Sequence, residues 1–182
     1  ISKLYKAVTP DFIEKGVSNF FSNLGDLSVI ANEILQLKFD EAASDVSRVL
    51  VNSTIGLLGF FDISSEIGLP KHNEDFGQTL ALWGFEPGPY IVVPFFGPAT
   101  LRDLSSLVID KGILNPMFYI EDGMTKAGLL TLNYVDFKSR FSSTNDLIGV
   151  AALDEYEFIK NAYFEKRAYE INDGNVIDFI EE

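Results

Sequence analysis

The sequence predicts one mainly α-helical domain of amphipathic helices, interrupted by an apolar hairpin rich in glycine and proline. Apolar residues recur at helical spacing through most of the chain, and the alternation typical of a strand is confined to Tyr90–Val93. A stretch of 15 uncharged residues between Pro87 and Leu101 holds four of the 7 prolines. A length of 182 residues suits a single domain that buries its own core.

The first two predicted helices follow one another, separated at Gly25. The first begins at Thr9–Asp11, where a hydroxyl N-cap, a proline at the first helical position and an acid in the first turn succeed each other. Its apolar residues share one face, and Gly25 is expected to end it. A second, shorter helix is expected from about Asp26 to Leu37.

A third helix is expected to start at Asp40, whose side chain can cap it, and to stop near Gly56–Gly59. The segment Gly68–Asn73 is the clearest internal break. Apolar sequence resumes directly after it, so we place no domain boundary there and treat residues 1–182 as one domain.

Two further helices and a final long one are expected after the hairpin. Pro98 can open a helix through Ile109, and Asn115-Pro116 repeats the cap-then-proline start of a helix that runs toward Phe141. Residues 142–145, Ser-Ser-Thr-Asn, predict a polar turn before the last helix, and Gly174 is expected to begin the tail.

The uncharged run is too broken to cross a membrane as a helix. Its 15 residues, at about 1.5 Å each, would span roughly 22 Å, which is less than the ~30 Å hydrocarbon core, and the prolines would interrupt them. We therefore expect a stiff apolar hairpin. Gly84, Gly88 and Gly97 are expected to supply its turns, and a hinge role for any of them is the weaker alternative.

Composition restricts the possible partners. The formal net charge of -13 argues against nucleic acid and against attachment to anionic lipid headgroups through basic residues. Hydrophobic residues make up 47% of the chain, with 16 phenylalanines, so part of the apolar surface is expected to face lipid or a partner. The sequence contains no cysteine, which removes disulfides and thiolate metal sites.

No motif of an enzyme, a cofactor site or a metal site is present in the sequence, so we expect none of these functions. The single histidine, His72, is expected to be a capping or surface residue, because one imidazole gives no recognisable ligand spacing. Asp154–Glu155 suit a helix start better than acid–base chemistry. Lys160, Lys166 and Arg167 are expected to be the later-turn counterparts of those charges.

Several segments together carry a resemblance to a known family. The core of the match is EDFGQTLALWGFEPGPY (74–90) followed by VPFFGPATLRD (93–103). Flanking it in the same order are TPDFIEKGVSNFFSNLGD (9–26), RVLVNSTIGLLGFFDIS (48–64) and DEYEFIKNAYFEKRAY (154–169). These segments span nearly the whole chain, which resembles the MlaA/VacJ family of outer-membrane phospholipid-transport lipoproteins.

The resemblance implies a ring of helices around an amphipathic channel, in a periplasm-facing lipoprotein of the bacterial outer membrane. Such a protein sits beside a trimeric outer-membrane porin, removes phospholipid from the outer leaflet and passes it to a periplasmic lipid carrier, which maintains lipid asymmetry. The alternative is a porin-binding or membrane-shaping scaffold that conducts no lipid. Members carry a signal peptide, a lipidated cysteine and a first helix ahead of the matched region, so we expect a fragment that lacks them.

The resemblance also points to residues of a lipid path. The hairpin residues expected to line it are Tyr90, Val92, Val93, Phe95 and Phe96, and the alternative is a buried extended turn. Trp83 and Phe85 are equally compatible with core packing and with the path. Arg102-Asp103 suits a local ion pair or helix-start charge better than a headgroup site.

Overall fold

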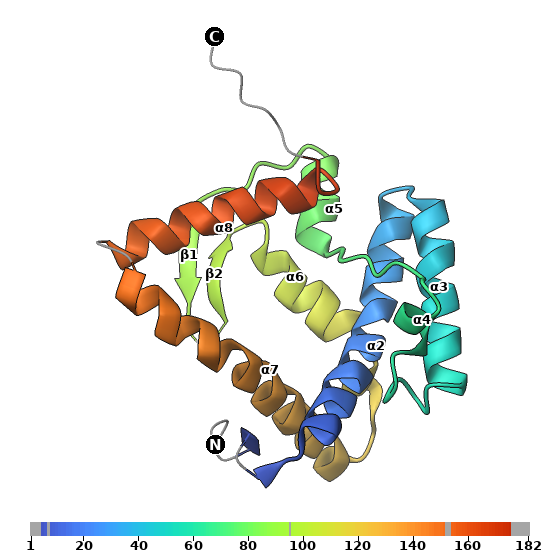
Figure 1. Cartoon of the computed structure of the whole chain (residues 1–182). Helices are drawn as coiled ribbons and strands as arrows, with labels where there is room; N and C mark the ends of the chain where they lie inside the picture. Colours follow the sequence, from blue (N-terminus) through green and yellow to red (C-terminus); the bar gives the residue numbers. More distant parts are fainter. Residues whose placement is uncertain (1–4, 7, 95, 152–153, 176–182) are drawn as a thin grey trace.

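The chain folds into a ring of helices with a small two-stranded sheet (Figure 1). The computed structural model describes residues 5, 6, 8–94, 96–151 and 154–175. Helix α2 (Asp11–Leu35) packs against α7 (Gly123–Ala151), which leads into α8 (Glu155–Ile171). Helix α8 packs against α5 (Phe76–Leu82), and α5 packs against α2, so the circuit closes. The predicted mainly α-helical ring is confirmed.

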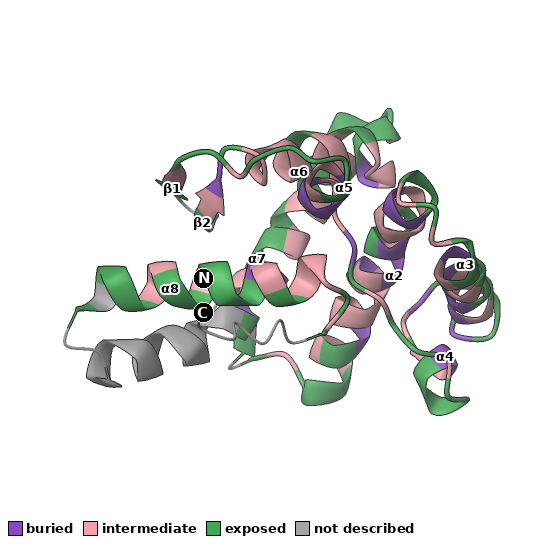
Figure 2. Cartoon of the chain, turned by 90° about the horizontal axis from the view of Figure 1, so that it is seen from above, coloured by how far each residue is buried: buried purple, intermediate pink, exposed green. Residues whose placement is uncertain are grey.

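A second layer lies across this ring. Strands β1 (Tyr90–Val93) and β2 (Gly97–Thr100) form an antiparallel hairpin, which continues into α6 (Leu104–Val108) and the π-helical turn η1 (Ile109–Ile113). A 3₁₀ turn, η2 (Pro116–Tyr119), connects η1 toward α7. Seen from above, the hairpin and α6 lie on one side of the molecule and the helices α7 and α8 on the other (Figure 2).

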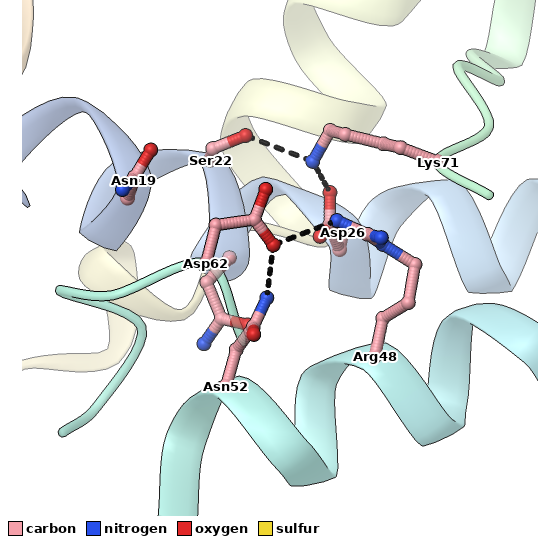
Figure 3. Close-up of a pocket in the computed structure, with 8 residues that line it drawn as sticks. Asn19, Ser22, Asp26, Arg48, Asn52, Asp62 and Lys71 are labelled. Atoms are coloured by element: carbon pink, nitrogen blue, oxygen red, sulfur yellow. Dashed lines mark hydrogen bonds and ion pairs between the residues drawn. The ribbon is translucent and has the colours of Figure 1, made fainter. Parts of the chain in front are cut away.

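The helices α3 (Phe39–Thr54) and α4 (Ile63–Glu66) pack outside α2 around a polar core (Figure 3). Arg48 Nη2 donates to Asp62 Oδ1 at 3.0 Å, and Asn52 Nδ2 donates to the same oxygen at 3.0 Å. Lys71 Nζ lies 2.5 Å from Asp26 Oδ1. The small cavity among them, about 20 Å³, has room for about one water molecule. This network fastens the chain after α3 onto α2.

The predicted break at Gly25 is wrong. Helix α2 runs through it for 25 residues, so the two expected helices are one, which begins after an N-cap at Pro10 without a side-chain cap. A mid-helix glycine costs about 1 kcal/mol relative to alanine. Packing of α2 against α3 and α7 offsets that cost. The third helix agrees with its expected limits more closely, since α3 ends at Thr54. Its N-cap is Lys38, however, so the expected cap by Asp40 is wrong.

Three predictions for the second half are also wrong. Pro98 opens no helix: it lies in β2 opposite Val92, in a two-stranded sheet where a proline need not donate to a further strand. Pro116 opens only a four-residue turn, although Asn115 does cap it by accepting from Met117 N at 3.0 Å. Helix α7 starts at Gly123 instead and continues through residues 142–145, where a turn was expected.

Burial is inverted relative to a typical water-soluble domain. In the described part of the chain, the buried hydrophobic side chains are Phe21, Ala42 and Met117. Buried polar side chains include Asn32, Glu33, Asp45, Arg48, Thr79, Thr100, Asp136 and Ser139. Large apolar side chains are exposed instead, among them Phe12, Phe39, Leu50, Ile55, Leu57 and Leu58. Apolar surface on this scale indicates an interaction with lipid or with a partner protein.

Within the described residues, no helix combines the length and the apolar character that crossing a membrane requires.

Candidate functional site

One part of the ring, between α2, α6 and α7, holds a cavity of about 650 Å³, within the range of small-molecule sites. Its walls come from α2, the start of α5, the hairpin, α6 with η1 and η2, and α7. The apolar lining side chains are Phe21, Leu24, Phe96, Leu107, Met117, Phe118, Leu130, Tyr134 and Phe137. Polar side chains at the same cavity are Ser28, Glu74, Asp75, Ser106, Asp110, Lys111, Asn115 and Asn133. The cavity can therefore accommodate an amphipathic molecule.

Among the described residues that line this cavity, the positively charged side chain is that of Lys111. It stands on the π-helical turn η1, and such turns are frequent at functional sites. Its Nζ lies 5.8 Å from the ring centroid of Phe96 and 5.5 Å from that of Phe137, within the range of cation–π interactions. The side chain of Lys111 is exposed to water. Desolvation by the surrounding protein nevertheless lowers the pKa of Lys111, and it outweighs the charges of Asp110 and Asp75, which act to raise that pKa.

A polar network inside the ring fixes one wall of the cavity. Asp110 accepts from Asn32 Nδ2 at 2.8 Å and from the backbone N–H of Phe76 at 2.9 Å, which connects η1 to α2 and α5. Thr79 Oγ1 donates to Asn32 Oδ1 at 2.8 Å. Phe76 and Thr79 of the sequence motif thus hold α5 against α2 and η1, while the preceding Glu74 and Asp75 line the cavity.

Arg167 of α8 completes the network from the other side. Its guanidinium donates to both oxygens of Asp75, at 2.7 and 3.0 Å, and to Asp103 Oδ1 at 3.0 Å. Burial alone would raise the pKa of Asp75, but the hydrogen bonds and the charge of Arg167 outweigh it and lower that pKa. Two carboxylates of the sequence motif are therefore kept ionised by one cation that lies 92 and 64 residues further along the chain.

The second carboxylate, Asp103, also accepts hydrogen bonds from the hydroxyl groups of Tyr163 and Thr100, the latter at 2.8 Å. Burial acts to raise the pKa of Asp103, whereas the bond from Tyr163 and the charge of Arg167 lower it. For Tyr163 itself, burial and the neighbouring Asp103 raise the pKa to about 12. Tyr163 also accepts from the backbone N–H of Thr100 at 3.0 Å, which anchors β2 on α8.

The structure separates the residues expected to line a lipid path. Phe96 lines the cavity. Tyr90 packs its ring against Tyr156, Tyr163 and Phe164 of α8, with centroids 5.7–5.9 Å apart. Val92 is 54% exposed and Val93 is half-buried. Phe95 lies outside the described residues.

The other predictions for the hairpin region concern its glycines, the exposure of Trp83 and Phe85, and the pair Arg102-Asp103. Gly84, Gly88 and Gly97 all have positive φ, at +88°, +68° and +94°, backbone angles that glycine adopts without strain. Trp83 and Phe85 are more than half exposed, so the core-packing alternative is wrong for both. Arg102 Nε lies 3.1 Å from Asp103 Oδ1, which confirms the local ion pair.

Sequence reasoning missed the roles of Lys111 and Arg167. Arg167 was grouped with Lys160 and Lys166, which do pair within their own helix, with Glu157 and Glu170. Arg167 is instead 8% exposed and pairs across the ring. Its helical phase relative to Tyr163, four residues earlier on the same face, was the available signal.

Comparisons with known proteins agree with this architecture. Residues 1–170 match the sequence profile of the MlaA lipoprotein family. An uncharacterised protein of Rickettsia felis is 33% identical over 163 residues, 90% of this chain and 65% of the relative. The intermembrane phospholipid transport system lipoprotein MlaA of Escherichia coli (strain K12) is 27% identical over 184 residues, 97% of this chain and 70% of the relative.

A solved structure described as the structural basis for maintenance of bacterial outer membrane lipid asymmetry superposes with a TM-score of 0.77. It is 24% identical in sequence, and the match covers 94% of this chain and 86% of that chain, which shows the shared fold. The chain spans just under two thirds of the length of its rickettsial relatives. On the profile match over 170 residues, the chain belongs to the MlaA lipoprotein family.

Proposed function

We propose that this protein removes phospholipid from the outer leaflet of the bacterial outer membrane through its central cavity and passes it to a periplasmic carrier. The observation that carries the proposal is an amphipathic cavity of about 650 Å³ inside a ring whose exterior is apolar. The name of the Escherichia coli relative, an intermembrane phospholipid transport system lipoprotein, supports the choice of substrate.

The energetics of lipid transfer explain why such a cavity is useful. Exposing acyl chains to water costs about 0.8 kcal/mol per methylene. For a phospholipid with two chains of roughly fifteen methylenes each, leaving the membrane through water therefore has a barrier on the order of 24 kcal/mol. A conduit lowers this barrier if it shields the tails and keeps the headgroup hydrated. The cavity offers both kinds of wall, with Leu24 and Leu130 on the apolar side and Asn115 and Asn133 on the polar side. No catalytic group is needed for this task.

The exterior fits a seat in a membrane beside another protein. Exposed apolar side chains of α2, α3 and the hairpin would contact lipid or a trimeric porin, and the hairpin residue Val92 belongs to this surface in our proposal. The lipid path includes Phe96, at the edge where the hairpin meets the cavity. The periplasmic carrier would receive the lipid and give the transfer its direction by binding it more tightly.

The cavity can be blocked at a position that tolerates a side chain. Gly25 lines the cavity, and a Cβ built there meets no atom within 4 Å. We expect Gly25→Trp to fold and to abolish transport, because the indole fills part of the path. The measurement is outer-leaflet phospholipid in cells that lack the native protein and carry the full-length protein, with membrane localisation checked.

The matched control is Gly25→Ala, which should restore low outer-leaflet phospholipid and stabilise α2 by about 0.5–1 kcal/mol. If Gly25→Trp reaches the membrane and works as well as the wild type, the cavity is no conduit. The protein would then act as a scaffold that binds a porin or shapes the membrane.

Lys111 provides a second test, directed at the headgroup. Its ammonium is the cation that a passing phosphate would meet at the cavity wall, close to Asp110 and Asp75. Lys111→Glu would add a third carboxylate there, so we expect at least a several-fold loss of transport. Lys111→Arg keeps the charge and should retain most activity. Equal activity of the two variants would show that charge at this position does not affect the lipid.

A further inference from the structure

A cluster outside the cavity joins α2, α3 and the segment after α4. Glu33 comes from α2, Asp45 from α3 and His72 from the stretch before α5. His72 Nδ1 lies 2.9 Å from Asp45 Oδ2 and 3.5 Å from Glu33 Oε1. His72 is therefore a partly exposed residue whose ring contacts two buried carboxyl groups, a role that the sequence did not indicate.

The buried carboxyl groups are incompletely satisfied. Glu33 has no exposed surface, and neither of its oxygens accepts a hydrogen bond from a donor of the described residues. Asp45 is 1% exposed, and its Oδ1, which has no hydrogen bond among the described residues, faces Arg48 Nε at 3.6 Å. A buried carboxylate without donors is costly unless a cation compensates it.

The spacing of the three groups suits coordination. With metal–ligand bonds of about 2.0–2.2 Å, a tetrahedral Zn²⁺ site separates its ligand atoms by about 3.3–3.6 Å. One ligand atom from each of the three residues lies within 4.8 Å of the other two. The separation of 3.5 Å between His72 and Glu33 falls in the tetrahedral range, and the 2.9 Å between His72 and Asp45 is slightly shorter than that range. One imidazole with two carboxylates is a donor set that Zn²⁺ accepts, and the partly exposed ring of His72 offers access from solvent.

We propose that Glu33, Asp45 and His72 form a binding site for a divalent transition-metal ion of the Zn²⁺ type. The ion would cross-link α2, α3 and the chain that leads into α5, and it would neutralise the two buried carboxylates. Its role is structural, because the cluster lies outside the set of described residues that line the cavity. The proposal does not depend on lipid transport.

The test uses zinc chloride and the chelator-washed full-length protein. We expect one Zn²⁺ per chain by calorimetry and a rise in Tm of several degrees that EDTA reverses. Glu33→Gln and His72→Gln should lose both effects. Asp40→Asn, which removes an exposed carboxylate at the start of α3, should keep them.

Absence of binding in the wild type, or binding that is unchanged in Glu33→Gln and His72→Gln, would overturn the proposal. Glu33 would then be protonated and share its proton with Asp45, and Glu33→Gln would be as stable as the wild type or more so. If a variant fails to fold, zinc X-ray absorption of the wild type decides. A shell with one imidazole nitrogen supports the site, and an all-oxygen shell overturns it.

Discussion

Arg167→Leu should lower the free energy of unfolding by about 3 kcal/mol, because the buried Asp103 and the partly buried Asp75 lose their shared cation. The side chain of Asp103 is 8% exposed and that of Asp75 is 32% exposed, so the effect belongs at the lower end of the range for broken buried pairs. Urea denaturation followed by circular dichroism measures it. The substitution should also loosen the packing of α8, because this pairing holds α8 against α5 and the hairpin.

The neighbouring residue supplies a matched control. Lys166 also lies on α8 and pairs with Glu170 at 2.7 Å, but its side chain is 71% exposed. Lys166→Leu should therefore cost no more than about 1 kcal/mol, as exposed ion pairs do. Equal destabilisation by the two substitutions would mean that α8 depends on helix charge in general and not on the pairing across the ring.

The pH dependence separates an electrostatic effect from a packing effect. The pKa values of Asp75 and Asp103 are lowered in the folded wild type, so they contribute stability above the unfolded carboxyl pKa of about 3.9, which is lost as pH falls through the folded values. Arg167→Leu removes the hydrogen bonds and the charge of Arg167, so the pKa values of Asp75 and Asp103 rise and the protonated forms are favoured. Asp103 keeps its hydrogen bonds from Tyr163 and Thr100, so its pKa rises less than burial alone would require. The stability gap between wild type and variant should thus narrow from pH 7 to pH 4.

Gly77→Ala should destabilise the protein by about 1–3 kcal/mol, through overpacking at the centre of the same network. A Cβ at Gly77 would lie 2.5 Å from Asp103 Oδ1, 2.8 Å from Arg167 Nη2 and 3.1 Å from the Cα of Asp103. Because a backbone atom is among these neighbours, α5 itself has to move away from residue 103. Thermal unfolding by circular dichroism gives the change in Tm.

Gly128→Ala is the control for the intrinsic effect of alanine in a helix. Gly128 is an exposed residue of α7, and a Cβ there meets nothing within 4 Å. The substitution should raise stability by about 0.5–1 kcal/mol. A stabilising Gly77→Ala would show that α5 and residue 103 are not in the close contact described above.

The sequence predicted the architecture better than the element boundaries. Helical periodicity and the family signature led to the ring, and the alternation in Tyr90–Val93 led to β1. Gly25 and Pro98 misled, because both were interpreted as local signals. Packing of α2 on two neighbours outweighs the cost of one glycine, and the hairpin partner of Pro98 could not be known from local sequence.

The cavity was predictable only in part. Phe96 belongs to the apolar run that attracted attention, and it does line the cavity. Met117 and Lys111 carry no motif, and they come together with Phe96 only through the path of η1 and η2 across the ring. A three-residue cluster such as Glu33, Asp45 and His72 is equally invisible, because its members lie on three separate elements.

The inverted distribution of polar and apolar side chains has a thermodynamic consequence. In most proteins, unfolding transfers a large apolar interior into water, which gives a heat-capacity increase of about 12–15 cal/mol/K per residue. Here much of the interior is hydrogen-bonded and ionic, while many apolar side chains are exposed before unfolding begins. The increase should be correspondingly small, and the stability curve flat. The free energy of unfolding then owes less to burying apolar side chains away from water. It depends more on what surrounds the exposed apolar side chains of the exterior.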